Sequence, residues 1–563
     1  MSDVDREVDL LVAGAGPAGM TAALVASLEG LDVLVCEKSD QVGGTGATSA
    51  GTLWIPGNTQ NKAAGYQDSA DQADKYLSGL IGETTLRELR DAFLGSGPEA
   101  IDYLTARSDV QFLPCGPHPD YRSNVAGAAT AGRAIVPVPF DGRLLGGDFR
   151  RVRAPIPEFM VLGGMMVGKA DLAPLIGRFA SLHNFIYATK LFARYLMDRI
   201  RYPRGTRLMM GNALVARLFH SLRKRKVPIL FDAAIVELLG DKTRVVGARV
   251  SVGGKELSIR ARRGVVLATG GYARNEEFRR TFMPQPVPAY SLSYEGNRGD
   301  GLAAGKRLGA ATGLEKGDSG LWAPVSLVPR RDGSKGLFPH LVLDRAKPGL
   351  IAVNSTGRRF VNEAMSYHDF VLAMFESHRT APSIPAHLIC DATFLKKYGL
   401  GVVYPGHRHP ETFVKNGYLF CGASLDDLAA KIAVNPQTLR ATVERHNEFA
   451  RTGVDTDFGK GEIELNRFNG DPQHLPNPCI GRLASPPFYA VAVWPADIAV
   501  STGLATDSDA RVRNTGGEVI AGLYACGNDM ASVMGGSYPG PGTTLGPAMV
   551  FAYRAARHAA GKL

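Results

Sequence analysis

Residues 8–19 read VDLLVAGAGPAG, and this stretch decides the fold of the chain around it. The apolar run of residues 8–13 is typical of a short strand that is buried on both faces. A glycine-rich turn follows, and the Ala- and Leu-rich residues 20–29 then predict a helix. Residues 31–36 (LDVLVC) predict a second strand, which leads directly to Glu37. The pattern therefore indicates a β-α-β unit.

The glycines of this unit have the spacing G-x-G-x-x-G, which is the fingerprint of a dinucleotide site. Gly14 allows the tight turn, Gly16 lets the backbone approach a pyrophosphate, and Gly19 lets the helix pack on the strand. The helix N-terminus, which contains Ala18, offers backbone N–H groups and the positive end of its dipole to phosphates. Glu37 lies where a carboxylate accepts hydrogen bonds from ribose hydroxyls.

Further glycine-rich segments favour FAD over NAD as the dinucleotide. Residues 43–52 combine glycines with small hydroxyl side chains, so their backbone can run along an extended FAD molecule, and residues 268–271 and 522–528 have a similar composition. Because the sequence has only one G-x-G-x-x-G fingerprint of this kind, we expect no separate nicotinamide domain. The predicted FAD contacts are Gly14, Gly16, Ala18, Gly19, Glu37, Lys38, Gly44, Thr45, Thr48, Ser49, Gly51, Ala268, Thr269, Gly270, Gly301, Gly527, Asn528, Thr544 and Leu545.

The middle of the chain differs in pattern from its two ends. Residues 281–480 combine proline-rich connections with short helix-like segments, whereas strand-like runs that resemble the first unit recur on both sides. We therefore predict an α/β fold in which a Rossmann-like FAD-binding domain of the glutathione reductase type is formed by residues 1–280 and 481–563. An α+β substrate domain at residues 281–480 is inserted into it.

Composition narrows the range of functions. The 563 residues carry a net charge of +10, but the charge is spread, and the basic residues 217–226 contain Phe219 as their only large aromatic. We therefore expect no nucleic-acid partner. The six cysteines do not have the spacing of metal ligands, so we expect that the protein binds no metal. Scattered cysteines in a large enzyme are typical of reduced thiols, and we therefore expect a cytoplasmic location. The acidic N-terminus lacks the pattern of a secretion signal, and no apolar run is long enough to span a bilayer.

Residues 171–201 leave two interpretations open. Their helix-like pieces mix Leu, Phe, Ile and Tyr with basic residues such as Lys190, Arg194 and Arg199. The segment is either a surface helix that rests weakly on a membrane and admits an apolar substrate, or a packed helix with a solvated basic face. We favour the packed helix and keep peripheral membrane association as the alternative.

Near the C-terminus, residues 537–548 read SYPGPGTTLGPA. A run of Gly and Pro that opens a helix presents backbone N–H groups, which suits an anion or an enolate oxygen. Tyr538 can donate a second hydrogen bond beside this turn. The alternative is a turn that only shapes the flavin pocket.

These motifs resemble the FAD-binding half of the fumarate reductase and succinate dehydrogenase flavoprotein superfamily, and in more detail the 3-ketosteroid Δ1-dehydrogenases. The resemblance runs nearly end to end. Its specific segments are GGMMV (163–167), GNALVARL (211–218) and YPGPGTTLGPA (538–548), while GDG (299–301) and GRRFVNE (357–363) are shared across the superfamily. Covalent members carry FAD on a His of the early glycine-rich loop. Residues 43–52 contain no His, so the resemblance implies non-covalent FAD.

The resemblance also implies the catalytic residues. A Tyr hydroxyl and a Gly N–H polarise the C3 carbonyl of the steroid, and by position these are Tyr538 and Gly542. A second Tyr takes the C2 proton while hydride leaves C1 for the flavin, and a third Tyr, matched here by Tyr121, assists it. The resemblance places this base shortly before residues 344–349, where this chain has no Tyr, so His340 is the candidate base. It is equally well explained as part of the pocket wall.

The predicted function is therefore FAD-dependent 1,2-dehydrogenation of a 3-ketosteroid, an apolar ketone, with an unidentified electron acceptor. The missing Tyr favours a related enzyme that desaturates another position, such as the 4,5 bond, or a non-steroidal cyclic ketone. A fumarate reductase-like enzyme is disfavoured because residues 364–369 offer no proton-delivering Arg. A flavin-binding protein without activity would not need Tyr538. The remaining tyrosines Tyr290, Tyr294 and Tyr367 are more often packing residues than cavity walls.

Overall fold

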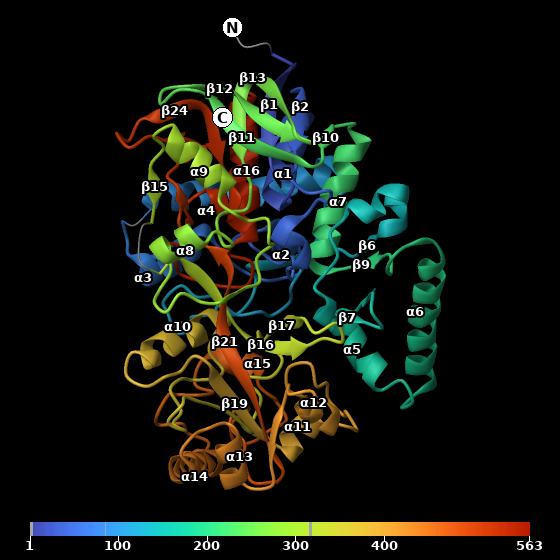
Figure 1. Cartoon of the computed structure of the whole chain (residues 1–563), viewed down its shortest axis with the longest axis vertical. Coiled ribbons are helices and arrows are strands. Elements are labelled where there is room, and N and C mark those ends of the chain that lie inside the picture. The colour runs from blue at the N-terminus through green and yellow to red at the C-terminus, as the bar shows by residue number, and fades with distance from the viewer. Residues whose placement is uncertain (1–3, 85, 315–317) are drawn as a thin grey trace.

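The computed structural model describes residues 4–84, 86–314 and 318–563. Its two largest sheets lie toward opposite ends of the long axis of the molecule (Figure 1). The strands of the first sheet come from both ends of the chain, and those of the second come from residues 290–500. The chain therefore leaves the first sheet, builds the second, and returns.

The first sheet gathers the predicted FAD-binding segments at one edge. The order of its main path is β10-β2-β1-β13-β12-β11, and β24 pairs with β13 and β23. Strands β2, β1, β13 and β24 are parallel, so their carboxyl ends, Cys36, Ala13, Leu267 and Ala525, lie side by side. The strands are β1 (Arg6–Ala13), β2 (Val33–Cys36), β10 (Ile229–Leu230), β11 (Ala233–Gly240), β12 (Val245–Val252), β13 (Lys255–Leu267), β23 (Arg511–Arg513) and β24 (Val519–Ala525).

Two helices from opposite ends of the chain pack together beside this sheet. Helix α1 (Pro17–Leu28) consists largely of Ala and other small residues and is buried along most of its length. Helix α16 (Leu545–Ala559) packs against α1 and against α4 (Arg87–Arg107). Close packing of α1 and α16 brings the C-terminal YPGPG turn to the same edge of the sheet as the G-x-G-x-x-G turn.

The second sheet is organised around one long strand, β21 (Phe488–Val500), which pairs with β16, β19, β14 and β20. Its path is β17-β16-β21-β19-β18. The other strands are β14 (Tyr290–Ser291), β16 (Gly320–Pro329), β17 (Lys335–Pro339), β18 (Leu350–Val353), β19 (Ala386–Asp391) and β20 (Phe420–Gly422). Since β21 lies beyond residue 480, we propose that the substrate domain includes it.

Helices of the second sheet surround it on its outer side. Helix α10 (Tyr367–His378) packs on β16, and α13 (Leu425–Lys431) packs on α14 (Pro436–Thr452). Smaller helices of the chain are α2 (Thr59–Ala63), α3 (Ala70–Ile81), α7 (Met210–Lys224), α8 (Glu276–Phe282), α9 (Asp300–Arg307), α11 (Ala392–Tyr398), α12 (Glu411–Lys415) and α15 (Glu464–Asn469). Short strands are β3 (Leu53–Trp54), β4 (Phe112–Pro114), β5 (Ala134–Pro137), β6 (Phe140–Asp141), β7 (Met160–Val161), β8 (Met165–Met166), β9 (Arg207–Leu208), β15 (Thr312–Gly313) and β22 (Gly503–Leu504).

Helices α5 (Lys169–Ile176) and α6 (Leu182–Arg201) form a hairpin that projects from the side of the molecule (Figure 1). The segment predicted at residues 171–201 is thus two helices with a turn between them. Large apolar side chains are exposed on this hairpin, including Phe179 at 80% and Ile200 at 87% of their full accessibility. Within the described parts of the chain, no helix combines the length and the apolar character that a membrane span requires.

Candidate active site

A cavity of about 2390 Å³ lies where the two sheets face each other. One part of its wall consists of the glycine-rich segments that follow the parallel strands of the first sheet. The other part is formed by the substrate domain, by the YPGPG turn and by the α5–α6 hairpin. The cavity therefore joins the predicted dinucleotide site to an apolar space.

The glycines of the first turn have the conformations that the fingerprint requires. Gly14 has a φ of 107°, and a Cβ there would overlap the carbonyl oxygen of Ala268. A Cβ on Gly19 would overlap the carbonyl oxygen of Gly14, so Gly19 allows α1 to approach the strand. A Cβ on Gly16 would meet open space, and Gly16 lines the cavity at the N-terminus of α1. This arrangement is a phosphate cradle.

The acidic residue after β2 is fixed from both sides. One carboxylate oxygen of Glu37 accepts a hydrogen bond from Ala15 N at 2.8 Å, and the other accepts from Ser39 N and Oγ at 2.9 Å each. The next residue, Lys38, bonds Asp300 at 2.5 Å. Glu37, Lys38 and Asp300 all line the cavity, so they border the space that a ribose would occupy.

Most of the predicted FAD contacts border the cavity. These are Gly14, Gly16, Ala18, Glu37, Lys38, Gly44, Thr45, Thr48, Ser49, Gly51, Ala268, Thr269, Gly270, Gly527, Asn528, Thr544 and Leu545. Gly19 and Gly301 do not; Gly301 N donates to Thr269 Oγ1 at 3.0 Å and supports the wall from behind. The cradle, the fixed carboxylate and the long groove of glycines and hydroxyls fit FAD, and residues 43–52 offer no His for a covalent bond.

Three tyrosines from distant parts of the chain meet at the substrate side of the cavity. Tyr121 Oη lies 3.1 Å from Tyr367 Oη. The rings of Tyr121 and Tyr538 stack with centroids 5.7 Å apart, and Tyr367 packs edge-on against Tyr538 at 5.3 Å. Tyr367 and Tyr538 line the cavity, whereas Tyr121 lies behind them. The structure thus brings together Tyr121 and Tyr538, as the sequence predicts, and adds Tyr367.

The three phenols are nearly inaccessible to solvent: Tyr121 is 3%, Tyr538 is 6% and Tyr367 is 8% exposed. Burial raises the pKa of each phenol well above its usual range, because the charged phenolate is poorly solvated there. Such phenols are hydrogen-bond donors at neutral pH. One of them can act as a base only if its surroundings favour the phenolate.

Gly542 lies in the turn before α16. It has a φ of 93°, a Cβ there would overlap the Thr52 carbonyl oxygen, and it lines the cavity with Tyr538. Its own carbonyl accepts bonds from Trp54 N at 3.2 Å and from Gly546 N at 2.9 Å. The turn is therefore held on both sides, and its place before a helix N-terminus suits the binding of a partly negative oxygen.

His340 is placed differently from the expectation. It is fully buried, its Nδ1 lies 2.6 Å from Asp344 Oδ2, and its Nε2 lies 2.8 Å from Ser326 Oγ. With both ring nitrogens occupied and no part of it among the lining residues, His340 does not face the cavity. The order Ser326–His340–Asp344 imitates a hydrolytic triad, but Ser326 is also fully buried, so substrate cannot reach it.

Sequence reasoning favoured a packing role for Tyr367, whereas the structure places it in the cavity wall. The usable signal was its spacing: it follows Asn362-Glu363 of the superfamily motif by four residues and begins a helix. Of the other two tyrosines, Tyr294 also lines the cavity and lies under the Arg153 guanidinium, 3.6 Å from its ring centroid. Tyr290 packs edge-on against Trp494 at 6.0 Å and is not among the lining residues.

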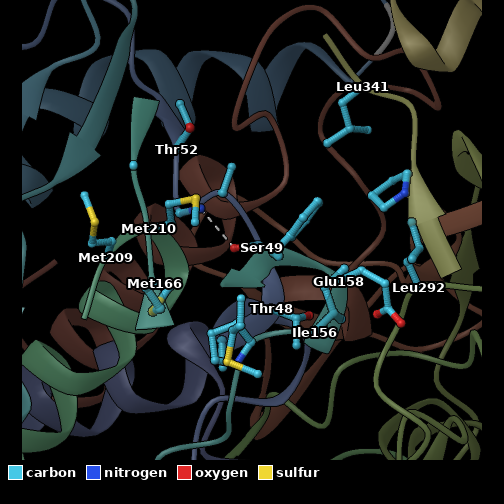
Figure 2. A pocket seen from close by; sticks show the side chains of 18 of the residues that line it. Thr48, Ser49, Thr52, Ile156, Glu158, Met166, Met209, Met210, Leu292 and Leu341 are labelled. Atoms are coloured by element: carbon cyan, nitrogen blue, oxygen red, sulfur yellow. Dashed lines mark hydrogen bonds between the residues drawn. The ribbon is translucent and has the colours of Figure 1, made fainter. Parts of the chain in front are cut away.

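The rest of the substrate side is apolar. Figure 2 shows Met166, Met209 and Met210 on one side of the cavity and Leu292 and Leu341 on the opposite side. Leu292 and Leu341 pack against the hydrophobic cluster that contains the three tyrosines. Phe179, Phe185 and Phe192 of the α5–α6 hairpin extend the apolar wall. A flat hydrophobic molecule can therefore lie against the tyrosines.

The described residues contain no group of three or more His, Cys, Asp or Glu side chains that is arranged to hold a metal ion. Among the described residues the six cysteines form no disulfide bond, and four of them are buried.

Comparison with known proteins agrees with this geometry. Residues 9–545 match the family described as FAD binding domain. The chain is 38% identical to a 4-oxocyclohex-2-ene-1-carboxylate 5-dehydrogenase of Sinomonas cyclohexanicum, covering 98% of this chain and 93% of that protein. It is 36% identical to a 3-oxosteroid 1-dehydrogenase of Mycobacterium tuberculosis, with 99% and 98% covered.

Among solved structures, the chain is similar to a 3-ketosteroid Δ1-dehydrogenase from Sterolibacterium denitrificans in complex with 1,4-androstadiene-3,17-dione. The TM-score is 0.90 at 37% identity, with 99% of this chain and 100% of that chain covered. The predicted α/β flavoprotein fold is confirmed by this similarity. The chain therefore belongs to the FAD-binding flavoprotein family that includes the 3-oxosteroid 1-dehydrogenases, and it is an FAD-dependent oxidoreductase.

Proposed function

We propose that this protein removes hydrogen from the carbon–carbon bond next to a ketone, and that its substrate is a 3-ketosteroid desaturated between C1 and C2. The observation that carries the proposal is the meeting of Tyr538, Gly542 and Tyr367 at one wall of a cavity that also contains the FAD cradle. The names of the relatives support the same reaction class, since each is a dehydrogenase of a cyclic ketone.

Tyr538 and Gly542 bind the ketone oxygen. The Tyr538 phenol stays protonated because burial raises its pKa, so its O–H donates to the oxygen, and the Gly542 N–H provides a second donor. Both donors are held in place before the reaction, and each such donor stabilises a developing enolate by about 3–4 kcal/mol. The hydrogens on the α-carbon become more acidic as a result. When bound, FAD supplies the oxidant that accepts the hydride.

Tyr367 takes the α-proton in this proposal, in place of His340. Its phenol lines the cavity beside Tyr538, whereas His340 is enclosed. Tyr121 is a positioning residue: its O–H lies within hydrogen-bond distance of Tyr367 Oη at 3.1 Å and supports the phenolate from behind. General-base catalysis of this kind typically contributes about 10²–10⁴-fold to the rate.

The cavity wall favours a steroid over a small oxo acid. Its substrate side is lined mainly by Met, Leu and Phe side chains, which gain free energy by covering a large apolar molecule. The rival is a cyclic oxo acid, and the 38% identical relative with that specificity supports it. A carboxylate would have to rely on the cations near residues 397–409 at the cavity wall, such as Lys397 and Arg408.

Comparison of kcat/KM on two substrates tests the proposal. We expect a 3-ketosteroid without the 1,2 double bond to exceed 4-oxocyclohexanecarboxylate by at least about 10²-fold, with an artificial dye as electron acceptor. The opposite order would assign the enzyme to the oxo acids. Turnover of neither compound, by protein that contains its full amount of FAD, would remove the proposed function.

The apolar substrate reaches the cavity from the α5–α6 hairpin, which rests weakly on a membrane surface. The hairpin exposes apolar side chains, namely Phe179, Leu182 and Ile200. It also exposes the cations Lys190 and Arg199. Apolar and basic side chains on one helix are typical of interfacial helices. Phe185 and Phe192 of the same hairpin line the cavity, so a molecule leaving the lipid would meet apolar side chains throughout.

Co-sedimentation with vesicles tests this surface. We expect binding to vesicles that contain anionic lipid, weaker binding at high salt, and loss of most binding in the double variant Phe179→Glu/Ile200→Glu. A matched control is Leu475→Glu, which changes a side chain that is 80% exposed elsewhere on the molecule. Equal sedimentation of all three proteins would show that the hairpin does not contact lipid.

A further inference from the structure

A buried arginine lies behind the three tyrosines without a carboxylate bound to its guanidinium group. Arg345 is 2% exposed, and the described residues include no acidic side chain within ion-pair distance of it. Its guanidinium donates instead to four carbonyl oxygens: His340 at 2.7 Å, Leu341 at 2.9 Å, Glu363 at 2.8 Å and Met365 at 3.1 Å. A buried cation that is bound only by dipoles keeps most of its field.

These four bonds join two loops that form the catalytic wall. Leu341 belongs to the loop after β17 and packs against the hydrophobic cluster that contains the tyrosines. Glu363 and Met365 belong to the loop that leads directly to Tyr367 at the start of α10. The rigid, planar guanidinium of Arg345 thus fixes the position of the Leu341 loop relative to the loop that leads to Tyr367.

The nearest acidic neighbour is already occupied. Asp344 Oδ2 is bound by His340 Nδ1 at 2.6 Å and by Gly401 N at 3.2 Å, while its Oδ1 accepts from the backbone N–H of Arg345 at 2.9 Å. The hydrogen bonds of the Asp344 carboxylate thus go to His340 and to backbone N–H groups and not to the Arg345 guanidinium, although the negative charges of Asp344 and Glu363 still act on Arg345 and raise its pKa. Burial lowers the pKa of Arg345 to about 10, so it is still a cation at neutral pH.

The groups that face the Tyr367 phenol come from three other segments and from its own helix. Tyr121 and Tyr538 are neutral phenols, and Arg345 is the cation. On α10, burial lowers the pKa of His368 to about 4, so it is neutral, and Asp369 is paired with the half-exposed Arg122 at 2.7 Å. Burial is the largest effect on the pKa of Tyr367 and Tyr121 and raises it, the neighbouring phenols raise it further, and the charge of Arg345 lowers it by a smaller amount.

We propose that Arg345 is a positioning residue of the reaction, which holds the Tyr367 loop in place and favours the phenolate form of Tyr367 through its buried positive charge. The inference rests on the proposed function, because it needs Tyr367 as the base. Proton removal by a phenol requires the ionised form, and each unit by which the pKa falls makes that form tenfold more abundant below the pKa. Arg345 thereby makes an enclosed tyrosine usable as a base.

The test is the pH dependence of kcat/KM between about pH 6 and pH 10 for three FAD-loaded variants. We call the pH at which kcat/KM stops rising the pH position of the profile. In Arg345→Met we expect this pH position to move upward by at least about one unit. The rate at neutral pH should be lower by about tenfold or more. Arg345→Lys keeps the charge and should restore most of that pH position, although not the full rate. Asp344→Asn removes an anion and should move the pH position downward.

Arg122→Met is the matched control, because it removes a cation beside the same helix that is half-exposed and screened by solvent. We expect its pH profile to match the wild type. An unchanged pH position in Arg345→Met, or equal rates in Arg345→Met and Arg345→Lys, would overturn the electrostatic role. If Arg345→Met does not fold, the pH profile of Arg345→Lys decides the matter: the proposal expects the pH position to stay near that of the wild type because the charge is kept, and an upward shift of about one unit or more would overturn it. Full activity of Tyr367→Phe would instead remove the proposed base, independently of Arg345.

Discussion

The phenol oxygens of Tyr121 and Tyr367 lie 3.1 Å apart, although 246 positions separate these residues in the chain. Tyr121 comes from the loop before β5 and Tyr367 from the start of α10, and both rings pack on Tyr538. In the proposed mechanism, Tyr538 faces the ketone oxygen, Tyr367 faces its α-carbon, and Tyr121 supports Tyr367 from behind.

Replacing the proposed base tests this division of roles. Tyr367→Phe should lower kcat by about 10²-fold or more, because the ring remains but the group that accepts the proton is lost. FAD content and KM should change little, since the substituted ring still fills the wall. Steady-state kinetics on a 3-ketosteroid measures the effect. A rate near that of the wild type would return Tyr367 to a packing role.

Tyr538→Phe should also reduce turnover by about 10²-fold or more, for a different reason: one of two donors to the developing enolate is removed. The pH at which the rate stops rising should stay where it is, in contrast to variants of Arg345. Stopped-flow measurement of flavin reduction isolates this step. Unchanged flavin reduction would mean that Tyr538 does not bind the ketone oxygen.

Gly542→Ala should reduce kcat by about 10²-fold, because a Cβ at its φ of 93° is strained and would overlap the Thr52 carbonyl oxygen. The matched control is Gly561→Ala, which has a similar φ of 68° but open space around the new methyl group. We expect the control to retain its activity. Similar rates for the two variants would show that the turn tolerates displacement.

The carboxylate of Glu363 should contribute strongly to stability. It is fully buried and bonds Arg359 at 2.8 Å and Lys460 at 3.1 Å. Burial alone would raise the pKa of Glu363, but the two cations lower it well below its usual range. Glu363→Ala leaves them poorly compensated and should lower the free energy of unfolding by about 3–5 kcal/mol.

Urea denaturation measures this change. The control is Glu448→Ala, which breaks a solvent-exposed pair with Arg451 and should change the free energy of unfolding far less than Glu363→Ala does. Equal losses in the two variants would contradict the argument from burial.

Stability should fall on mild acidification. Burial lowers the pKa of His368, His387 and His446 to about 4 each. In the unfolded chain these histidines have pKa values near 6.5. Between about pH 6.5 and pH 4 the unfolded chain therefore binds more protons than the folded chain. The free energy of unfolding declines as the pH falls through that window. The urea midpoint should therefore be lower at pH 5 than at pH 7. His446→Gln should weaken this dependence, and an identical pH dependence in that variant would argue against a contribution from His446.

Most of the residues predicted to contact FAD line one cavity, and they could be picked out from the sequence because their signals are local. One β-α-β unit contains the strand at residues 6–13, the glycines Gly14 and Gly16, and Glu37. The spacing of these residues alone determines where they meet. The same reasoning placed Tyr538 and Gly542 before a helix. These features follow from short-range geometry that any similar sequence would share.

The proposed base, Tyr367, could not be found in the same way. Tyr367 reaches Tyr538 because α10 packs on β16 and Arg345 joins two loops, which are contacts between distant segments. His340 was attractive because it is titratable and near the expected position. It is excluded from the cavity by a side-chain direction that residue spacing does not reveal. The extension of β13 back to Lys255 and the place of β21 in the second sheet were missed for the same reason.

The most direct test of the central claim is anaerobic mixing of the FAD-loaded enzyme with a saturated-ring 3-ketosteroid, with the flavin absorbance recorded and the product analysed by NMR. We expect the flavin to bleach in a single turnover and the new double bond to lie between C1 and C2. A flavin that keeps its absorbance with every ketone, or a double bond at another position, would contradict the account.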